Sequence, residues 1–310
     1  MVVVMKFLTT ILILTLSWAM PAHATSVTIT HALGETTLEK NPQRVVVLGV
    51  GALDMLTAFD IDPIATSQDY LPEYLEKYTQ APYASAGTIF EPDFEGIYTL
   101  KPDVIFIGPR AAKGYKDLSK IAPTIVISPS DTGSYWKSTQ QQWRNLAAIF
   151  EISDRVETTI QRLDKEFKAI HQFTQTHPST ALTVMSAGGV VTAFSEDSRF
   201  GSSIYMDFGF TQAAPGLKTK RHGDAISFEF INKVNPEHLI ILDADKLRNQ
   251  FSSRTKEEFS NPLIEATLSY KNDNILYVDM NAWYLAMGGV VATERMLAEI
   301  KQLIDSPRKG

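Results

Sequence analysis

The 310-residue chain contains no cysteine. This absence excludes a disulfide framework and a lipid anchor attached through cysteine. The chain also has no run of basic residues, and its formal net charge is −6. Because nucleic-acid-binding proteins carry a concentrated positive surface, this mildly acidic balance argues against nucleic acid as the main partner. Any positive surface must therefore be local.

Long apolar runs are missing everywhere except near the start of the chain. Lys6 precedes an apolar stretch over 8–20, and Ala22-His23-Ala24 has the small-x-small pattern of a cleavage site. The stretch is shorter than the roughly 20 residues that cross a bilayer, so it predicts a secretory signal peptide over 1–24, cleaved near Ala24, rather than a membrane anchor. Export without lipidation favours a soluble protein of a Gram-negative periplasm, not inserted in the membrane.

Motifs of several enzymes and of nucleotide-binding proteins are also missing. No histidine pair has HExxH spacing, and no serine lies in a nucleophile-elbow context. A hydrolase or a three-histidine zinc carrier is therefore not expected. Gly49-Val50-Gly51 follows an apolar run, but Asp54 occupies the position where the dinucleotide fingerprint needs its third glycine. A tight turn between a strand and a helix explains these glycines without a nucleotide.

The residues that are present predict a packed α/β protein. Hydrophobic residues make up 44% and charged residues 21% of the chain, which is typical of a globular protein with room for about two domains. Continuous apolar runs predict buried parallel strands, and apolar periodicity predicts helices. The main strands are expected at 44–49, 104–108, 124–128, 239–243 and 275–279, and helices at 70–78, 93–100, 136–150, 201–208 and 294–304.

One segment of the sequence occurs twice. Asp93-Phe94-Glu95 and Lys101-Pro102-Asp103 match Ser227-Phe228-Glu229 and Asn235-Pro236-Glu237 at a constant offset of 134 positions. A shared spacing of polar cap, phenylalanine, glutamate, proline and acid predicts one structural unit used in two similar lobes. The ligand is then expected between the lobes, with the two glutamates in matching places.

A long amphipathic segment separates the two copies. Ser153 can cap a helix whose apolar residues recur at steps of three and four until Pro178 stops it. Because this segment lies between the repeated units, we expect a rigid connector at 153–177. The N-terminal lobe is then 25–152 and the C-terminal lobe 178–310.

Candidate binding residues lie mostly in loops after strands or between helices. His222 belongs to the loop Lys218-Thr219-Lys220-Arg221-His222-Gly223, which can offer positive charge to an anion and one nitrogen to a metal. Arg110 follows the strand at 104–108, at the sheet edge where open α/β proteins bind ligands. Arg199 and Tyr284 lie in loops of the second lobe. Taken singly, each has an equally good ordinary explanation as a solvated or half-buried surface residue.

The chain resembles the periplasmic siderophore-binding proteins of ABC iron importers, and most closely the branch that binds iron(III) catecholates of the enterobactin, vibriobactin and petrobactin kinds. The resemblance runs over nearly the whole chain after residue 24. The matching passages are NPQRVVVLGVGALDML, PDFEGIYTLKPDVIFIGPR, SRFG, the RHG loop with the FEF that follows it, and WYLAMGG. It implies two Rossmann-like α/β lobes joined by one long helix (a class III, or cluster A, binding protein) that move little on binding.

The resemblance also implies roles for particular residues. His222 and Tyr284 match a histidine and a tyrosine that complete iron coordination when the siderophore supplies only four oxygens. Phenolate is a hard donor that suits ferric iron, and imidazole is an acceptable one. Arg110 and Arg199 match two arginines that hold the anionic complex, and guanidinium can donate to several catecholate oxygens at once. Ferric iron is thus expected as part of the ligand, with no permanently bound cofactor.

The chain departs from its relatives at one position and keeps two glutamates in common with them. Asp243-Ala244 stands where relatives have a third arginine, and Lys246, Arg248, Lys220 or Arg221 could substitute for it. Glu95 and Glu229 match glutamates that meet arginines of the membrane permease, although the helix dipole also favours a glutamate in a first turn.

These observations predict a binding protein, not an enzyme, that acts as a monomer and delivers a ferric catecholate to an inner-membrane ABC permease. Two alternatives remain. One is a haem- or corrinoid-binding protein of the same fold, although the density of cations favours a more polar ligand. The other is an exported α/β enzyme that uses His222 as a base.

Overall fold

The computed structural model describes residues 25–218, 222–248 and 253–305. Its strands are β1 (Ser26–His31), β2 (Gly34–Glu39), β3 (Val45–Leu48), β4 (Ala65–Thr66), β5 (Ala84–Ser85), β6 (Val104–Ile107), β7 (Thr124–Val126), β8 (Thr180–Ala187), β9 (Val190–Phe194), β10 (Thr211–Gln212), β11 (Asp224–Ile226), β12 (His238–Asp243) and β13 (Ile275–Tyr277). Its α-helices are α1 (Val50–Ala58), α2 (Phe94–Leu100), α3 (Tyr115–Leu118), α4 (Tyr135–Phe150), α5 (Ser153–Thr176), α6 (Phe228–Val234), α7 (Asp245–Arg248), α8 (Thr255–Glu258), α9 (Pro262–Glu265), α10 (Leu268–Lys271) and α11 (Val290–Asp305). Short 3₁₀ or π segments are η1 (Glu73–Thr79), η2 (Ala111–Gly114), η3 (Ser203–Asp207) and η4 (Asn281–Leu285).

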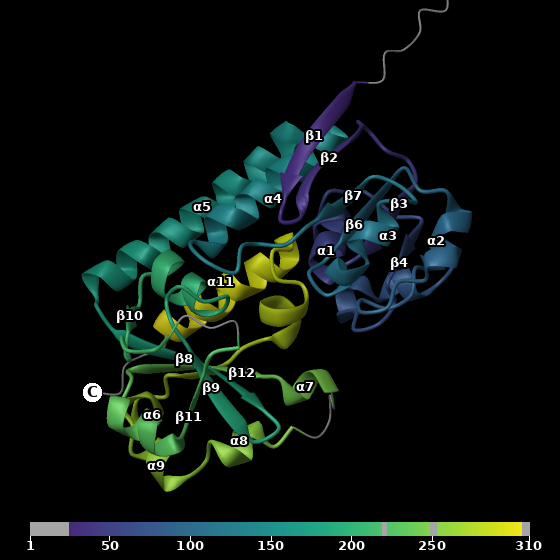
Figure 1. Ribbon diagram of the computed structural model, residues 1–310. Coiled ribbons are helices and arrows are strands. Elements are labelled where there is room, and N and C mark those ends of the chain that lie inside the picture. The colour runs from purple at the N-terminus through teal and green to yellow at the C-terminus, as the bar shows by residue number, and fades with distance from the viewer. Residues whose placement is uncertain (1–24, 219–221, 249–252, 306–310) are drawn as a thin grey trace, which may run out of the picture.

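The described residues form two α/β lobes, each around its own sheet (Figure 1). The first sheet is parallel throughout, in the order β5-β4-β3-β6-β7. In the second sheet, β8, β12 and β13 are parallel. On the other side of β8, β9 pairs antiparallel with β8, and β11 pairs antiparallel with β9. The central strands β3, β6 and β12 are buried along their whole length, as expected for strands covered on both faces. The predicted fold class is therefore confirmed.

The repeated sequence segment forms the same unit in both lobes. Asp93 caps α2 by accepting a hydrogen bond from the Gly96 amide, and Ser227 caps α6 in the same way. Each helix has seven residues and ends at a left-handed residue, Lys101 (φ 47°) or Asn235 (φ 50°). Each is followed at the same offset by a buried strand, β6 or β12.

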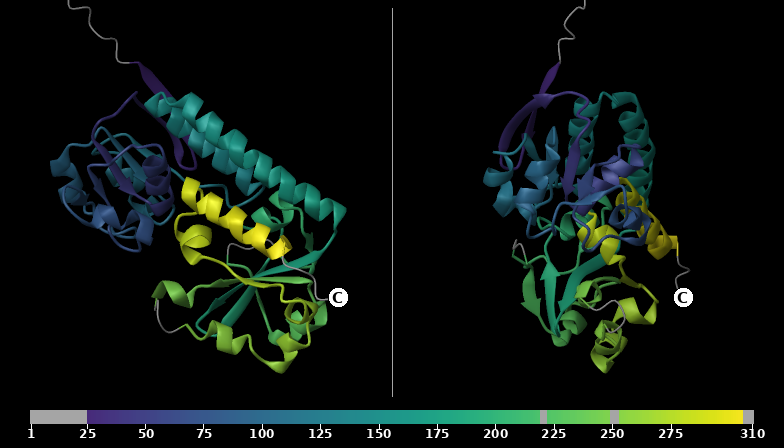
Figure 2. Two further views of the ribbon diagram at one scale, coloured as in Figure 1. Left: turned by 180° about the vertical axis from the view of Figure 1, so that it is seen from behind. Right: turned by 90° about the vertical axis from the view of Figure 1, so that its right-hand side faces the viewer.

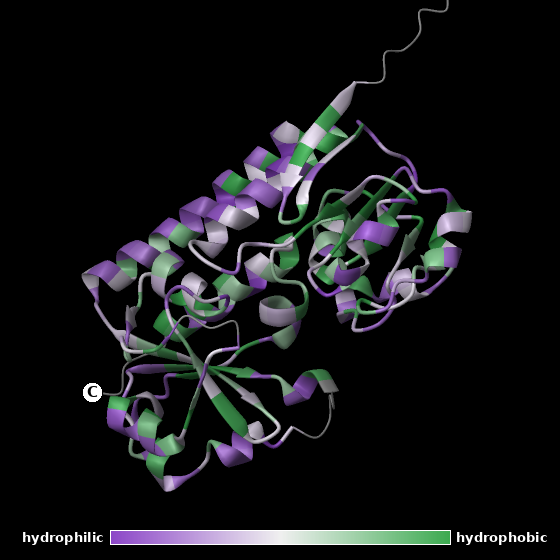
Figure 3. Ribbon diagram, in the orientation of Figure 1, coloured by the Kyte–Doolittle hydropathy of each residue, from purple (hydrophilic) through white to green (hydrophobic). Residues whose placement is uncertain are grey.

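Helix α5 contacts both lobes along its length (Figures 1 and 2). Near its start, Arg155 donates to the Phe59 carbonyl of the first lobe at 3.1 Å. Near its end, the Thr174 hydroxyl donates to the Phe208 carbonyl of the second lobe at 2.6 Å. Its apolar stripe packs into the core, while hydrophilic residues cover much of its remaining surface (Figure 3).

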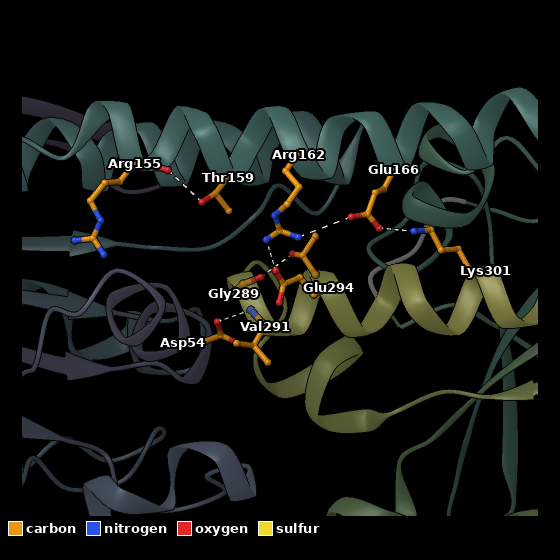
Figure 4. A network of polar contacts seen from close by, with 10 residues as sticks. Asp54, Arg155, Thr159, Arg162, Glu166, Gly289, Val291, Glu294 and Lys301 are labelled. Carbon is orange, nitrogen blue, oxygen red and sulfur yellow. Dashed lines mark hydrogen bonds and ion pairs between the residues drawn. The ribbon is translucent and has the colours of Figure 1, made fainter.

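Ion pairs align α11 beside α5 (Figure 4). Arg162 of α5 pairs with Glu294 of α11 and, at 3.8 Å, with Glu166 on its own helix. Glu166 also pairs with Lys301, one turn before the end of α11. Exposed pairs of this kind contribute little singly, but a chain of four side chains fixes the relative register of the two helices.

A buried carboxylate ties the start of α11 to the first lobe. Asp54 of α1 is fully buried, and its oxygens accept hydrogen bonds from the Val291 amide at 2.9 Å and the Ala292 amide at 3.0 Å. The Tyr74 hydroxyl donates to the same carboxylate at 2.7 Å. A side chain at position 289 would lie 2.3 Å from the Asp54 carboxyl carbon, so this position requires glycine. Burial raises the pKa of Asp54 to about 6.

Three predicted helices differ from the structure. The helix predicted at 201–208 is mainly a π segment, η3 at 203–207. The closing helix begins at Val290 rather than Glu294, because Asp54 of the other lobe satisfies amides of its first turn. The helix predicted at 70–78 is a 3₁₀ segment at 73–79.

The glycines of the Gly49-Val50-Gly51 turn serve close packing, since a side chain on Gly49 would meet the Gly108 amide at 2.7 Å. Every helix in the described ranges is too short or too polar to traverse a bilayer.

Candidate functional site

A cleft of about 580 Å³ lies between the lobes. Arg110 reaches it from the loop after β6, at the carboxyl edge of the first sheet. Arg199 enters from the loop before η3, His222 from the loop before β11, and Tyr284 from η4. The structure thus brings together four residues that the sequence singled out, from segments up to 174 positions apart.

Tyr284 is the point on which the two arginines converge. The backbone carbonyl of Tyr284 accepts hydrogen bonds from Arg199 Nη2 at 3.1 Å and from Arg110 Nη2 at 3.5 Å. The guanidinium carbons of Arg110 and Arg199 also lie 4.7 Å and 5.1 Å from the centre of the Tyr284 ring. Phe200 stacks on the same ring from the second lobe, with centroids 5.8 Å apart. Cations from both lobes therefore hold the phenol ring of Tyr284. Their positive charge favours an anionic group beside that ring.

The side chains around Arg110 leave its positive charge available to a ligand. Within the described residues, no carboxylate lies within ion-pair distance of Arg110, whose side chain is partly exposed in the cleft. The carboxylate of Asp245 lines the cleft too, and its two oxygens are oriented by a shared hydrogen bond from the Gly188 amide at 3.1 Å. An anion with several oxygens could accept hydrogen bonds from guanidinium groups on opposite walls.

His222 is exposed and precedes a glycine that fixes its loop against β9. Gly223 has φ +73°, and a side chain there would lie 2.7 Å from the Ala193 carbonyl. The loop therefore runs close along β9, which places His222 in the lining of the cleft. Both an imidazole and a phenol thus border one cavity.

The other predicted cations are placed differently. Lys246 lines a neighbouring groove of about 540 Å³, which shares Tyr70, Leu247 and Leu285 with the cleft. Arg248 is the last residue of α7, and its side chain lies outside what the structure describes. Lys220 and Arg221 fall outside the described residues. That one of these cations replaces the missing third arginine stays a prediction.

Comparison with known proteins assigns the family. The model of the family described as periplasmic binding protein matches residues 45–282. The chain belongs to this family. Its two-lobed architecture and interlobe cleft agree with that assignment, and its relatives are named as binding proteins.

Among similar proteins, several are named for ferric siderophores. The petrobactin-binding protein YclQ of Bacillus subtilis is 33% identical over 279 residues, covering 89% of this chain and 87% of the relative. The ferric-anguibactin-binding protein FatB of Vibrio anguillarum is 31% identical, covering 92% and 88%. The crystal structure of the periplasmic catecholate-siderophore binding protein VctP from Vibrio cholerae has 53% identity and a TM-score of 0.87, covering 90% of this chain and 100% of that one.

In this periplasmic binding protein, Glu95 and Glu229 lie on the surface, outside the cleft. Each is exposed in the first turn of its helix, α2 or α6, and the two occupy equivalent positions of the repeated unit. A hydrogen bond from the Ser227 side chain lowers the pKa of Glu229, which keeps that carboxylate ionised. Two equivalent anionic points on separate lobes are suited to one partner that contacts both.

Sequence reasoning missed the apolar part of the cleft. Tyr70, Phe90 and Val190 line it with large exposed side chains, and Met185 and Phe194 extend the apolar wall. No motif marks these residues, because an exposed aromatic and a buried one look alike in a sequence. A weak signal was the placement of Tyr70 and Phe90 in loops that follow strands, where ligands bind in open α/β sheets.

Proposed function

We propose that this periplasmic binding protein captures a ferric catecholate siderophore in the interlobe cleft and passes it to an inner-membrane ABC permease. The observation that carries the proposal is the convergence of Arg110 and Arg199, from different lobes, on Tyr284 in a cleft that His222 also lines. A ferric catecholate is an anion, so guanidinium groups on both walls stabilise it. The relatives named for petrobactin and for catecholate siderophores support this ligand class.

Iron would be held by ligand and protein together. A tetradentate siderophore leaves two positions of octahedral iron open, and the phenolate of Tyr284 and an imidazole nitrogen of His222 are donors that ferric iron accepts. A hexadentate siderophore fills all six positions and needs the cleft for charge and shape alone. The protein performs no catalysis in this account, because binding and release leave the siderophore chemically unchanged.

Location and organisation follow from the same proposal. Residues 1–24, which fall outside the described residues, act as a secretory signal cleaved near Ala24, and the mature monomer works in a Gram-negative periplasm. Residues 25–152 and 178–310 are the two lobes, and the helix at 153–177 connects them. Contacts of α5 with both lobes, through Arg155 and Thr174, support this division.

Removing the imidazole tests direct iron ligation. We expect His222→Ala to weaken a tetradentate ferric catecholate by roughly tenfold or more, about 1.4 kcal/mol, and to leave a hexadentate complex almost unchanged. The measurement is a titration of each complex into the protein, followed by quenching of tryptophan fluorescence. His177→Ala, which removes an exposed histidine at the end of α5, is the matched control. Equal weakening of both complexes, or of neither, removes His222 from the coordination shell.

Charge reversal on the two lobes tests docking. We expect Glu95→Arg and Glu229→Arg each to lower transport by roughly tenfold, because each brings like charges together at the permease surface. Affinity for the ferric ligand should stay unchanged, since neither residue lines the cleft. Uptake into proteoliposomes carrying the cognate permease measures transport. Glu257→Arg, an exposed first-turn glutamate of α8, is the control. Normal uptake by the Glu95→Arg/Glu229→Arg double variant would refute the docking role.

A further inference from the structure

Two large aromatic side chains face the interlobe cleft without being buried. The side chain of Phe90 is 57% exposed and that of Tyr70 is 47% exposed, yet both line the cavity that holds Arg110 and Tyr284. Their rings meet edge to face, with centroids 6.3 Å apart and planes at 84°. This arrangement lets each ring support the other while part of their surface stays open to a third group.

Local hydrogen bonds fix the backbone that carries both rings. Tyr70 follows β4 and has φ +55°, a left-handed conformation that is rare and costly for a bulky residue. The neighbouring Asp69 accepts a hydrogen bond from the Ile89 amide at 2.9 Å, which ties this loop to the one after β5. In that second loop, the Thr88 hydroxyl accepts from the Phe90 amide at 3.2 Å. The backbone is thus fixed in a way that presents the two rings together.

The second lobe also contributes apolar side chains to this cavity. Met185 of β8 and Val190 of β9 come from the second lobe, and Val190 is 55% exposed. The guanidinium groups of Arg110 and Arg199 in the same cavity lie over the Tyr284 ring. Because the face of an aromatic ring carries partial negative charge, it disfavours anionic oxygens and favours a neutral planar group. The cleft therefore suits a ligand that combines anionic oxygens with a flat apolar face.

We propose that Tyr70 and Phe90 form an aromatic subsite that binds an aryl face of the ferric ligand, away from its metal-bound oxygens. This inference rests on the proposed function, because it assigns the part of the same ligand that the arginines do not hold. Tyr70 and Phe90 would then make the protein prefer ligands that carry aryl groups over chelates of similar charge that have no ring. Both residues would contact the ligand directly.

A series of substitutions at Phe90 tests the subsite. We expect Phe90→Ala and Phe90→Leu to weaken a ferric bis(catecholamide) roughly three- to tenfold, whereas Phe90→Trp stays within about twofold of the wild type. Leucine keeps the apolar surface and loses the ring, so it separates aromatic contact from simple burial. Tyr70→Ala should weaken binding to a similar extent. Tyr270→Ala is the control, because Tyr270 is 45% exposed and lies outside the cleft.

The measurement is a fluorescence titration of each variant, with thermal unfolding to verify that the exposed substitutions leave the fold intact. Wild-type affinity in Phe90→Ala would overturn the subsite, and so would wild-type affinity in Phe90→Leu. Weakening by Tyr270→Ala of the same size would also overturn it. In each of these cases the wild type still binds, and the proposed function stands. A wild type that binds no ferric catecholate would overturn both proposals.

Discussion

The Arg110→Ala/Arg199→Ala double variant is expected to bind a ferric catecholate about a thousandfold more weakly than the wild type. A hydrogen bond to a charged group contributes about 1.5–3 kcal/mol, so each arginine accounts for roughly 10- to 100-fold in affinity. Both guanidinium groups also hold the backbone of Tyr284, at 3.5 Å and 3.1 Å from its carbonyl oxygen. Their loss therefore removes positive charge and also loosens the residue that we propose as an iron donor. Equilibrium titration of the single and double variants measures the effect.

Two controls separate the roles of charge and geometry. Arg254→Ala removes an exposed arginine of the second lobe outside the cleft and should bind like the wild type. Arg110→Lys and Arg199→Lys keep the charge but lose the planar group that donates to two oxygens, so intermediate affinities are expected. If the double alanine variant binds within threefold of the wild type, the cleft does not hold its ligand through these cations.

Asp54→Ala is expected to lower the free energy of unfolding by about 3 kcal/mol at pH 5. The substitution leaves the Val291 and Ala292 amides and the Tyr74 hydroxyl without their buried acceptor, at about 1–3 kcal/mol for each unpaired group. Relief of carboxylate burial offsets part of that loss. Since these amides begin α11, the contact between the first lobe and the closing helix is weakened (Figure 4). Urea unfolding measures the change.

The same carboxylate should make stability depend on pH. Burial raises the pKa of Asp54 from 3.8 to about 6, so the folded state disfavours its ionised form. The protonated Asp54 side chain stabilises the folded state fully below pH 3.8. This stabilisation is lost as the pH rises through about 6, and the free energy of unfolding changes by about 3 kcal/mol. Burial also raises the pKa of Asp207 to about 6, so the wild-type profile contains both groups.

Comparison with Asp54→Asn isolates the contribution of Asp54. The asparagine cannot ionise. The free energy of unfolding of the Asp54→Asn variant, relative to that of the wild type, should therefore rise between pH 4 and pH 6 and stay level above that range. Asp117→Ala, at an exposed ion pair with Lys120, should change stability by less than about 0.5 kcal/mol and show no such trend. A constant difference between wild type and Asp54→Asn across this range would refute a raised pKa at Asp54.

The duplicated segment made the fold predictable from sequence. Polar caps at Asp93 and Ser227 and apolar runs before and after them are local signals, and the structure repeats them with the same caps and strands. The start of α11 was not predictable, because Asp54 is 237 positions away from the amide that it caps. The apolar periodicity of a sequence shows which side of a helix is buried. It cannot show that a residue of the other lobe caps the helix.

The polar part of the candidate site was predictable for a similar reason. Arg110 follows a buried parallel strand, and the carboxyl edge of such a sheet is where ligands bind. The resemblance to siderophore-binding proteins then pointed to Arg199, His222 and Tyr284. The aromatic pair was not predictable, because nothing near Phe90 in the sequence shows that its ring stays exposed. Convergence of both arginines on one carbonyl likewise depends on tertiary structure alone.

Tryptophan fluorescence of the wild-type protein, titrated with a ferric bis(catecholamide), tests the central claim most directly. Trp283 adjoins Tyr284 in η4 and is fully buried, so energy transfer to a coloured ferric complex in the cleft should quench its emission. We predict saturable quenching that is complete at one equivalent of ligand and is lost in the Arg110→Ala/Arg199→Ala variant. Absence of quenching at micromolar ligand, or equal quenching of the double variant, would contradict a cationic iron-siderophore site between the lobes.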